Sequence, residues 1–372
     1  MRRTLAVTSL AAIAAITVCL AGCTPDLGVH PRTSVSDGAQ QSDALLERFL
    51  DDTAPGCSAA IGIKGEVVWA GARGFADLES GTPLTANSVF DIASVAKQFT
   101  ATAILLLASD GELAMSDSLA DHVDGLPGWS RTVTVEQLVQ HRSGIPDYTS
   151  LLTEAGIALS SPATQESAIR ALGSVDLNFA PGERFEYSNS NYILLAEVVH
   201  AAAGVPLPEF LYARVFSPLD LDMRVDPGFV SAEVATPYEQ VDDTFVASRS
   251  RWSQLGDGSL FTTPSELVRW ADSYRIHTLV DADILERTLD EAPLMGDPAR
   301  SRYGPGIQIA QDNSLSHIGG WGQYTTIFGI SADRKVAIAV SCNSFAVDPL
   351  PIAEGLRIVW ASETPAAEQP AN

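Results

Sequence analysis

The chain has 372 residues, of which 46% are hydrophobic and 19% charged, and its 46 acidic side chains outnumber 23 basic ones. A net charge of −23 repels nucleic acid and anionic lipid surfaces, so neither is expected as an electrostatic partner. The length, without a low-complexity tract or internal repeat, fits one large two-lobed globular unit.

The first 22 residues have the pattern of a secretory signal. Arg2 and Arg3 precede an apolar stretch from about Leu5, which ends in the letters LAGC at Cys23. This ending resembles the lipobox of bacterial lipoproteins, in which lipid is attached to the cysteine and cleavage falls just before it. We therefore expect residues 1–22 to be removed and lipidated Cys23 to hold the protein on the outer side of the bacterial cell membrane. A plain signal peptide or a short transmembrane anchor is the alternative.

Residues 23–40 are rich in turn-forming residues, which predicts a flexible tether. Apolar residues then recur at helical spacing in SDALLERFLDD (42–52), with Ser42 as a candidate N-cap. The segment 57–77 has the pattern of two strands that turn near Lys64 and Gly65.

Between about residues 90 and 300 the signals are mostly helical, at 94–109, 134–141, 191–204 and 263–274. Strand patterns return at 301–310, 314–320, 323–331 and 335–343, with a hairpin turn expected at 332–335, and a last helix is expected at 351–362. Strands at both ends predict one α+β domain over 41–361, in which both termini complete a single sheet. Its α/β lobe would comprise about 41–85 and 302–361, its helical lobe about 86–301, and residues 362–372 would form a disordered tail. The cleft between the lobes is the expected ligand site.

Lys97 is one of only three lysines and begins an apolar run, TATAILLLAS, where lysine is rarely buried without a partner. Ser94, three residues earlier, would share a helix face with Lys97, at a helix N-terminus that favours developing negative charge. Desolvation favours the neutral amine of a buried lysine, which can accept the proton of a hydroxyl and so activate it as a nucleophile. A single Ser-x-x-Lys match is weak evidence, so a chance match remains the alternative.

Two further segments carry candidate polar residues. Tyr187 and Asn189 stand just before a predicted helix that Ser188 or Asn189 could cap. His317 ends a predicted strand before a pair of glycines that permit close approach of a ligand. Taken singly, a buried tyrosine beside an N-cap and a structural strand histidine explain these segments better than a functional role does.

Together, the motifs Ser94-x-x-Lys97, Tyr187-x-Asn189 and His317-x-Gly319 resemble those of the penicillin-recognising serine hydrolases. The resemblance is strongest to the branch with class C β-lactamases, a D-Ala-D-Ala carboxypeptidase and related esterases, and it covers about residues 41–361. It implies a β-lactamase/transpeptidase-like fold, with an antiparallel sheet flanked by helices and an inserted, mostly helical lobe.

The resemblance also implies a role for each matched residue. Ser94 would be the nucleophile that is acylated, and Lys97 and Tyr187 would share the general-base and general-acid duties. Asn189 would help to hold the substrate amide. The backbone N–H groups of Ser94 and Gly320 would form the oxyanion hole.

The third motif departs from the family pattern. His317 takes the place of the class C lysine and would line the far wall of the cleft, next to Gly319. Ile318 replaces a threonine or serine whose hydroxyl helps to bind the substrate carboxylate, and Trp321 adds apolar bulk nearby. We therefore expect D-alanyl-D-alanine carboxypeptidase-like or esterase-like hydrolysis of a small molecule or a peptidoglycan peptide. A β-lactamase, or a non-catalytic protein that binds penicillin or cell-wall peptide, is the alternative.

Neither a G-x-S-x-G nucleophile elbow nor an H-E-x-x-H zinc motif is present in the sequence, and no cofactor or metal is expected. No feature of the sequence predicts an oligomeric state.

Two cysteines remain for the folded domain, since Cys19 would leave with the signal and Cys23 would carry lipid. The family sheet places the first strand antiparallel to the last, so the resemblance implies a disulfide between Cys57 and Cys342. Two buried free thiols are the alternative.

Overall fold

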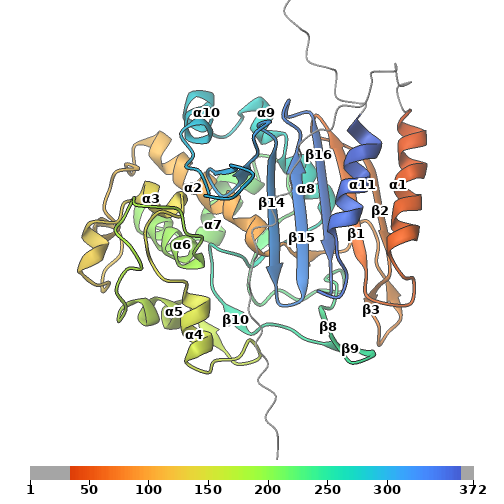
Figure 1. Ribbon diagram of the computed structural model, residues 1–372, viewed down its shortest axis with the longest axis horizontal. Helices are drawn as coiled ribbons and strands as arrows, with labels where there is room; N and C mark the ends of the chain where they lie inside the picture. The colour runs from red at the N-terminus through yellow and green to blue at the C-terminus, as the bar shows by residue number, and fades with distance from the viewer. Residues whose placement is uncertain (1–33, 362–372) are drawn as a thin grey trace, which may run out of the picture.

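The computed structural model describes residues 34–361, so the predicted signal peptide, Cys23 and the tail at 362–372 lie outside the described residues. A seven-stranded sheet, on the right of Figure 1, is antiparallel throughout. Its strands come from both ends of the chain, which confirms the predicted architecture. In spatial order they are β12 (Arg302–Tyr303), β13 (Gln308–Ile309), β14 (Leu315–Trp321), β15 (Tyr324–Ile330), β16 (Val336–Cys342), β1 (Cys57–Ile63) and β2 (Glu66–Arg73).

Helices cover both faces of this sheet because alternate strand residues point to opposite sides. Ala59 and Ile61 of β1 join the core beneath α1 (Val35–Phe49) and α11 (Leu350–Trp360), which lie side by side in Figure 1. Ala60, between them, belongs to the larger core shared with α8 (Pro264–Trp270) and the helical lobe. α8 falls inside the range predicted for the helical lobe, yet it packs on the sheet.

The first helix begins seven residues before the predicted N-cap. The Ser34 hydroxyl caps it by accepting a hydrogen bond from the N–H of Asp37 at 3.2 Å. Ser42 lies inside the helix, where its hydroxyl donates to the carbonyl of Gly38 and accepts from the indole N–H of Trp360. A Cβ at position 38 would lie 2.8 Å from the Trp360 ring, so glycine allows the helix to pack on α11. The tether predicted over 23–40 is therefore wrong for residues 35–40, because this long-range contact outweighs their turn propensity.

β1 and β16 are also linked covalently. Cys57 and Cys342 face each other in the ladder and form a disulfide with a Cα separation of 4.0 Å. This is shorter than the usual range of about 4.4–6.8 Å and nearest to the separation of about 4.5 Å found in non-hydrogen-bonded antiparallel pairs. The pairing implied by the family resemblance is thus present in the structure.

The helical lobe, on the left of Figure 1, surrounds α2 (Lys97–Asp110), which is buried from Lys97 to Leu107 and is capped by Gly111 in the left-handed conformation. The helix predicted at 263–274 is two helices, because the chain turns after Trp270. In chain order the remaining α-helices of the described chain are α3 (Val135–Val139), α4 (Tyr148–Glu154), α5 (Gln165–Leu172), α6 (Asn189–Ala203), α7 (Leu207–Leu211), α9 (Ser273–Ile276) and α10 (Ala282–Asp290). Short 3-10 turns at Ala93–Ala96, Leu119–Asp121 and Gly128–Arg131 and a π turn at Tyr212–Phe216 complete the helical elements.

Small sheets join the two lobes and complete the surface. One of them is three-stranded and orders β5 (Phe90–Asp91), β11 (Leu260–Thr262) and β7 (Arg224–Val225). The others are two-stranded and pair β6 (Ala163–Thr164) with β10 (Trp252–Ser253), β3 (Phe75–Asp77) with β4 (Thr82–Pro83), and β8 (Tyr238–Val241) with β9 (Thr244–Ala247).

Within residues 34–361, no single helix is long and apolar enough to cross a membrane. α6 and the segment Leu207–Phe216 meet the length and composition required only together, and they are bent by 72° at the break between them.

Candidate active site

Ser94 lies on a tight turn between the small sheet and the central helix. β5 leads into a 3-10 turn, Ala93–Ala96, which is followed directly by α2. Ala93 has a φ of 49°, a left-handed conformation that is costly for alanine. Its N–H donates to the carboxylate of Asp91 at 2.9 Å, which helps to hold this conformation immediately before Ser94.

Lys97 is fully buried and points at Ser94. Its Nζ donates to Ser94 Oγ at 3.0 Å, to Asn189 Oδ1 at 2.8 Å and to the backbone carbonyl of Asp257 at 2.8 Å. All three donors of an ammonium are therefore used. Within residues 34–361 Lys97 has no ion-pair partner, so no carboxylate competes with Ser94 for it.

Asn189 is fixed in one orientation by groups on both sides. Its amide oxygen accepts from Lys97, while its Nδ2 and its backbone N–H donate to Asp147 Oδ2 at 2.9 and 2.8 Å. Asp147, rather than Ser188 or Asn189, thus binds the first free N–H of α6. The Ser188 hydroxyl makes no capping bond and has no partner among the described residues, so the predicted side-chain cap is wrong.

Tyr187 lies next to the pair, but its hydroxyl is not bonded to it. Lys97 Nζ is 5.2 Å from the centre of the Tyr187 ring, and the buried hydroxyl has no hydrogen-bond partner within the described chain. A buried hydroxyl without a partner is energetically costly, so a ligand that supplied one would gain from this group.

His141 holds the Tyr187 segment in place, and sequence reasoning did not single it out. Its ring packs on Tyr187 with centroids 4.2 Å apart, and its Nδ1 accepts from the N–H of Ser188 at 3.2 Å. Its backbone carbonyl accepts from the N–H of Glu186 at 2.9 Å. His141 therefore contacts Tyr187 and both of its neighbours. Burial, together with the nearby Lys97 charge, lowers the pKa of His141 well below its usual value, so the ring is neutral.

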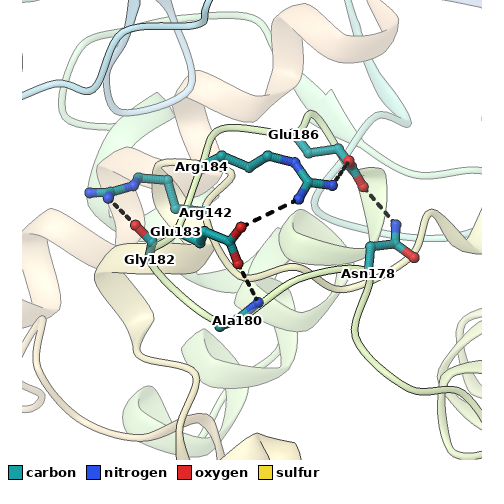
Figure 2. A network of polar contacts seen from close by, with 7 residues as sticks. All are labelled: Arg142, Asn178, Ala180, Gly182, Glu183, Arg184 and Glu186. Atoms are coloured by element: carbon teal, nitrogen blue, oxygen red, sulfur yellow. Dashed lines mark hydrogen bonds and ion pairs between the residues drawn. The ribbon is translucent and has the colours of Figure 1, made fainter.

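A polar network steadies the loop that leads to Tyr187 (Figure 2). Glu186 accepts from Asn178 Nδ2 at 2.6 Å and from Arg184 Nη2 at 3.0 Å, and Arg142 donates to the carbonyl of Gly182. Glu183 also accepts from the N–H of Ala180 at 3.2 Å, across the base of the loop.

His317 lies beneath the site rather than at its surface. Its side chain is 2% exposed, and it lies between the hydroxyl of Tyr303, 3.0 Å from Nε2, and the carbonyl of Ile318, 2.9 Å from Nδ1. Because a carbonyl only accepts, Nδ1 carries the proton and Nε2 accepts from Tyr303. Burial and the nearby Lys97 charge lower the pKa of His317 to about 3, so it stays neutral. The prediction that His317 lines the cleft is corrected, since its bulk packs inward while Ile318 next to it is 40% exposed.

The glycines after His317 bring β14 against the nucleophile turn. A Cβ at Gly319 would lie 2.2 Å from the carbonyl oxygen of Ile92 and 3.0 Å from the N atom of Ser94. Only glycine permits this approach. Gly320 is exposed, and a Cβ there would meet only the ring of Phe345, at 3.8 Å. The two backbone groups predicted for the oxyanion hole thus lie on segments in direct contact.

Asp257 is a second residue without a predicted role. Its backbone carbonyl accepts from Lys97, and its carboxylate accepts from the Tyr148 hydroxyl at 2.8 Å. Burial raises the pKa of Asp257 to about 6, although the charge of Lys97 opposes the rise. Gly256, with a φ of 102°, allows this loop to pack closely against α6, because a Cβ there would lie 2.2 Å from the carbonyl of Tyr192.

Across residues 34–361, no three His, Cys, Asp or Glu side chains are grouped so as to hold a metal ion. The site places the Ser94 hydroxyl next to the buried amino group of Lys97, with Tyr187 and the backbone N–H groups of Ser94 and Gly320 around them. With the two-lobed fold, this arrangement defines a serine hydrolase of the β-lactamase and penicillin-binding-protein type.

Comparison with known proteins gives the same class. The chain matches the family described as Beta-lactamase over residues 42–358 and belongs to it. It is 29% identical over 264 residues to a D-aminopeptidase of Brucella anthropi, covering 68% of this chain and 49% of that protein. It is 27% identical over 308 residues to a penicillin-binding protein of Bacillus subtilis, covering 74% and 66%. The chain therefore spans about half the length of the D-aminopeptidase.

Solved structures confirm the fold. An octameric penicillin-binding protein homologue from Pyrococcus abyssi superposes with a TM-score of 0.75 at 25% identity, covering 87% of this chain and 77% of that one. A D-amino acid amidase from Ochrobactrum anthropi gives a TM-score of 0.75 at 22% identity, covering 88% and 100%. The predicted β-lactamase/transpeptidase-like fold is thus confirmed.

Proposed function

We propose that the protein hydrolyses peptide or ester bonds through an acyl-enzyme on Ser94, as a D-alanyl-D-alanine carboxypeptidase-like or esterase-like enzyme. The observation that carries the proposal is the 3.0 Å contact between Ser94 Oγ and Lys97 Nζ, made by a lysine that is fully buried and has no ion pair in the described chain. A nucleophile within hydrogen-bond reach of a base is the arrangement that covalent catalysis requires.

In the proposed reaction, Lys97 first gives its ammonium proton to solvent, which leaves a lone pair facing Ser94 Oγ. This amine takes the hydroxyl proton while Ser94 Oγ bonds to the substrate carbonyl carbon. The carbonyl oxygen becomes an oxyanion, which the N–H groups of Ser94 and Gly320 would stabilise. Each such donor contributes about 3 kcal/mol in the transition state. The bond to the leaving group then breaks, and the leaving atom takes a proton from the Tyr187 hydroxyl, to which Lys97 returns one. Attack by water on the acyl-enzyme, with the same groups as base and acid, regenerates Ser94.

The substrate class draws support from two sources. A relative named D-aminopeptidase supports cleavage of an amide next to a D-residue, although the chain covers only half of that relative. Ile318 has no hydroxyl where the family pattern has one for a substrate carboxylate, which argues against efficient β-lactam hydrolysis.

The test uses wild type and Ser94→Ala with a D-Ala-D-Ala peptide, a p-nitrophenyl ester, a chromogenic cephalosporin and fluorescent penicillin. We expect Ser94-dependent turnover of the peptide or the ester and slow turnover of the cephalosporin. Fast cephalosporin turnover would make the protein a β-lactamase, and stable penicillin labelling without any turnover would make it a binding protein. Equal ester turnover by both proteins would rule out Ser94 as the nucleophile.

We also propose that lipid on Cys23 anchors the enzyme outside the cytoplasm. The Cys57–Cys342 disulfide supports this location, because disulfides persist in oxidising compartments. Detergent phase partitioning of wild type and Cys23→Ser after expression in a bacterial host tests it. The wild type should enter the detergent phase and Cys23→Ser should not. Equal partitioning would contradict the anchor.

A further inference from the structure

A cavity of about 230 Å³ lies beside the nucleophile turn. Aromatic side chains from four separate segments of the chain contribute to its wall. They are Phe229, Trp252, Phe261, Trp321 and Tyr324. The rings form two groups. The ring centroids of Trp252 and Trp321 are 5.4 Å apart, and Phe261 contacts both Phe229, at 5.6 Å, and Tyr324, at 6.4 Å. Apolar walls of this kind bind apolar parts of ligands.

Three walls of the cavity continue directly into the site. Asp91 lies in the wall and accepts the N–H of Ala93, the residue before Ser94. Trp321 follows the two glycines of β14, and the segment after Trp252 reaches Asp257, whose carbonyl binds Lys97. The cavity therefore adjoins the segments that hold the nucleophile, although Ser94 itself does not line it.

The cavity lies on the side of Ser94 that faces away from Tyr187. His317, near one end of β14, is 6.4 Å from Tyr187 between ring centroids, whereas Trp321 lies four residues further along the strand. Four residues of a strand span about 13 Å. In the proposed reaction Tyr187 protonates the leaving group. The opposite side, where the cavity lies, then receives the acyl half of the substrate.

Two arginines stand at the solvent-facing edge of the cavity. Arg249 and Arg251 line the cavity and are exposed to solvent. Although the chain has 46 acidic side chains, neither arginine forms an ion pair with any of the described residues. Asp91 is the only acidic residue in the wall, is 6% exposed, and binds the N–H of Ala93. Guanidinium groups bind carboxylates through paired, charge-assisted hydrogen bonds.

We propose that this cavity is the acyl-side binding site and that its ligand is an amphipathic anion. An aromatic or branched apolar group fills the cavity, and a carboxylate on the same half of the substrate is held by Arg249 and Arg251. This inference rests on the proposed function, because an acyl half exists only if Ser94 is acylated.

The test compares p-nitrophenyl esters that share a leaving group and differ in the acyl half. Comparing phenylacetate with acetate measures how much the aromatic ring contributes to kcat/KM. Comparing N-succinyl-phenylalanine with N-acetyl-phenylalanine measures how much the carboxylate contributes. We expect wild type to prefer the first member of each pair by about tenfold in kcat/KM, which corresponds to about 1.4 kcal/mol.

Variants separate the two contributions. Arg249→Ala/Arg251→Ala should lower kcat/KM for the succinyl ester about tenfold more than for the acetyl-phenylalanine ester, which abolishes the preference between them. Phe229→Ala, at a half-buried position, should reduce the preference for the ring. Arg170→Ala, which removes an exposed arginine paired with Glu166 elsewhere, is the matched control and should change neither preference.

The outcomes distinguish this inference from the function on which it rests. If wild type shows no preference in either pair, or the double arginine variant keeps the succinyl preference, the acyl-side assignment is wrong while Ser94-dependent turnover persists. If Ser94→Ala hydrolyses every ester at the wild-type rate, the proposed function itself fails.

Discussion

Replacing Gly319 by alanine should disable the site by moving its backbone. The new Cβ would lie 2.2 Å from the carbonyl oxygen of Ile92, whereas carbon and oxygen atoms normally approach no closer than about 3.3 Å. β14 and the Ser94 turn would then separate by about 1 Å, which is enough to cost about 100-fold in rate. The added methyl should also destabilise the fold by about 1–3 kcal/mol.

Gly320→Ala is the matched control, because a Cβ there meets only the Phe345 ring at an ordinary contact distance of 3.8 Å. The assay is kcat/KM for a p-nitrophenyl ester together with thermal denaturation, so that lost activity can be separated from lost fold. Gly319→Ala should melt cooperatively but turn over slowly, and Gly320→Ala should stay within a few-fold of wild type. Near-normal activity of Gly319→Ala, or an equal loss in both variants, would refute the reasoning.

Three other variants probe the supporting structure. Burial raises the pKa of Asp91 to about 7, whereas the carboxyl of the unfolded chain has a pKa of about 3.9. The folded state therefore binds the proton more tightly, and the free energy of unfolding falls as the pH rises from about 4 to 7. Asp91→Asn should therefore raise the melting temperature at pH 8 more than at pH 5, and an equal effect at both pH values would contradict this. The disulfide between Cys57 and Cys342 closes a separation of 285 residues, so Cys57→Ala/Cys342→Ala should lose up to about 5–6 kcal/mol of unfolding free energy in urea. A loss near zero would show that the strand ladder alone sets the stability. His141→Phe keeps a ring against Tyr187 but removes the acceptor for the Ser188 N–H, so kcat should fall about tenfold with little change in KM, as measured by ester kinetics. His141→Asn tolerates the φ of 54° and keeps an acceptor, so it should retain more activity than His141→Phe, and the reverse order would refute the positioning role.

The features that could be predicted from the sequence are those with a local signature. The glycine turn after Lys64, the alternating strands near the C-terminus and the apolar helix after Lys97 each have a periodicity of their own, and the structure contains all three. The disulfide and the spatial meeting of the three motifs came from the family resemblance, since nothing in the residues alone places position 57 beside position 342.

The features that were missed depend on partners far away in the chain. The acceptor at Asp257 lies 160 residues from Lys97 and acts through a backbone carbonyl, which has no side-chain signature. His141 acts on a segment 47 residues later, through an acceptor nitrogen and a ring face that many buried histidines could offer. The first helix extends back to Val35 because of contacts with a helix at the other end of the chain.

The polar groups around Ser94 differ in whether the protein already satisfies them, and this difference indicates where the substrate must act. All three donors of Lys97 have acceptors, and the Asn189 amide is held from both sides. The Tyr187 hydroxyl is buried and has no partner among the described residues. Preorganised groups cost no rearrangement during the reaction, whereas a buried hydroxyl without a partner carries a penalty of about 1–3 kcal/mol until an acceptor arrives. A leaving group that becomes basic as its bond breaks is such an acceptor. The relief is therefore greatest in the transition state, which is where binding energy accelerates a reaction.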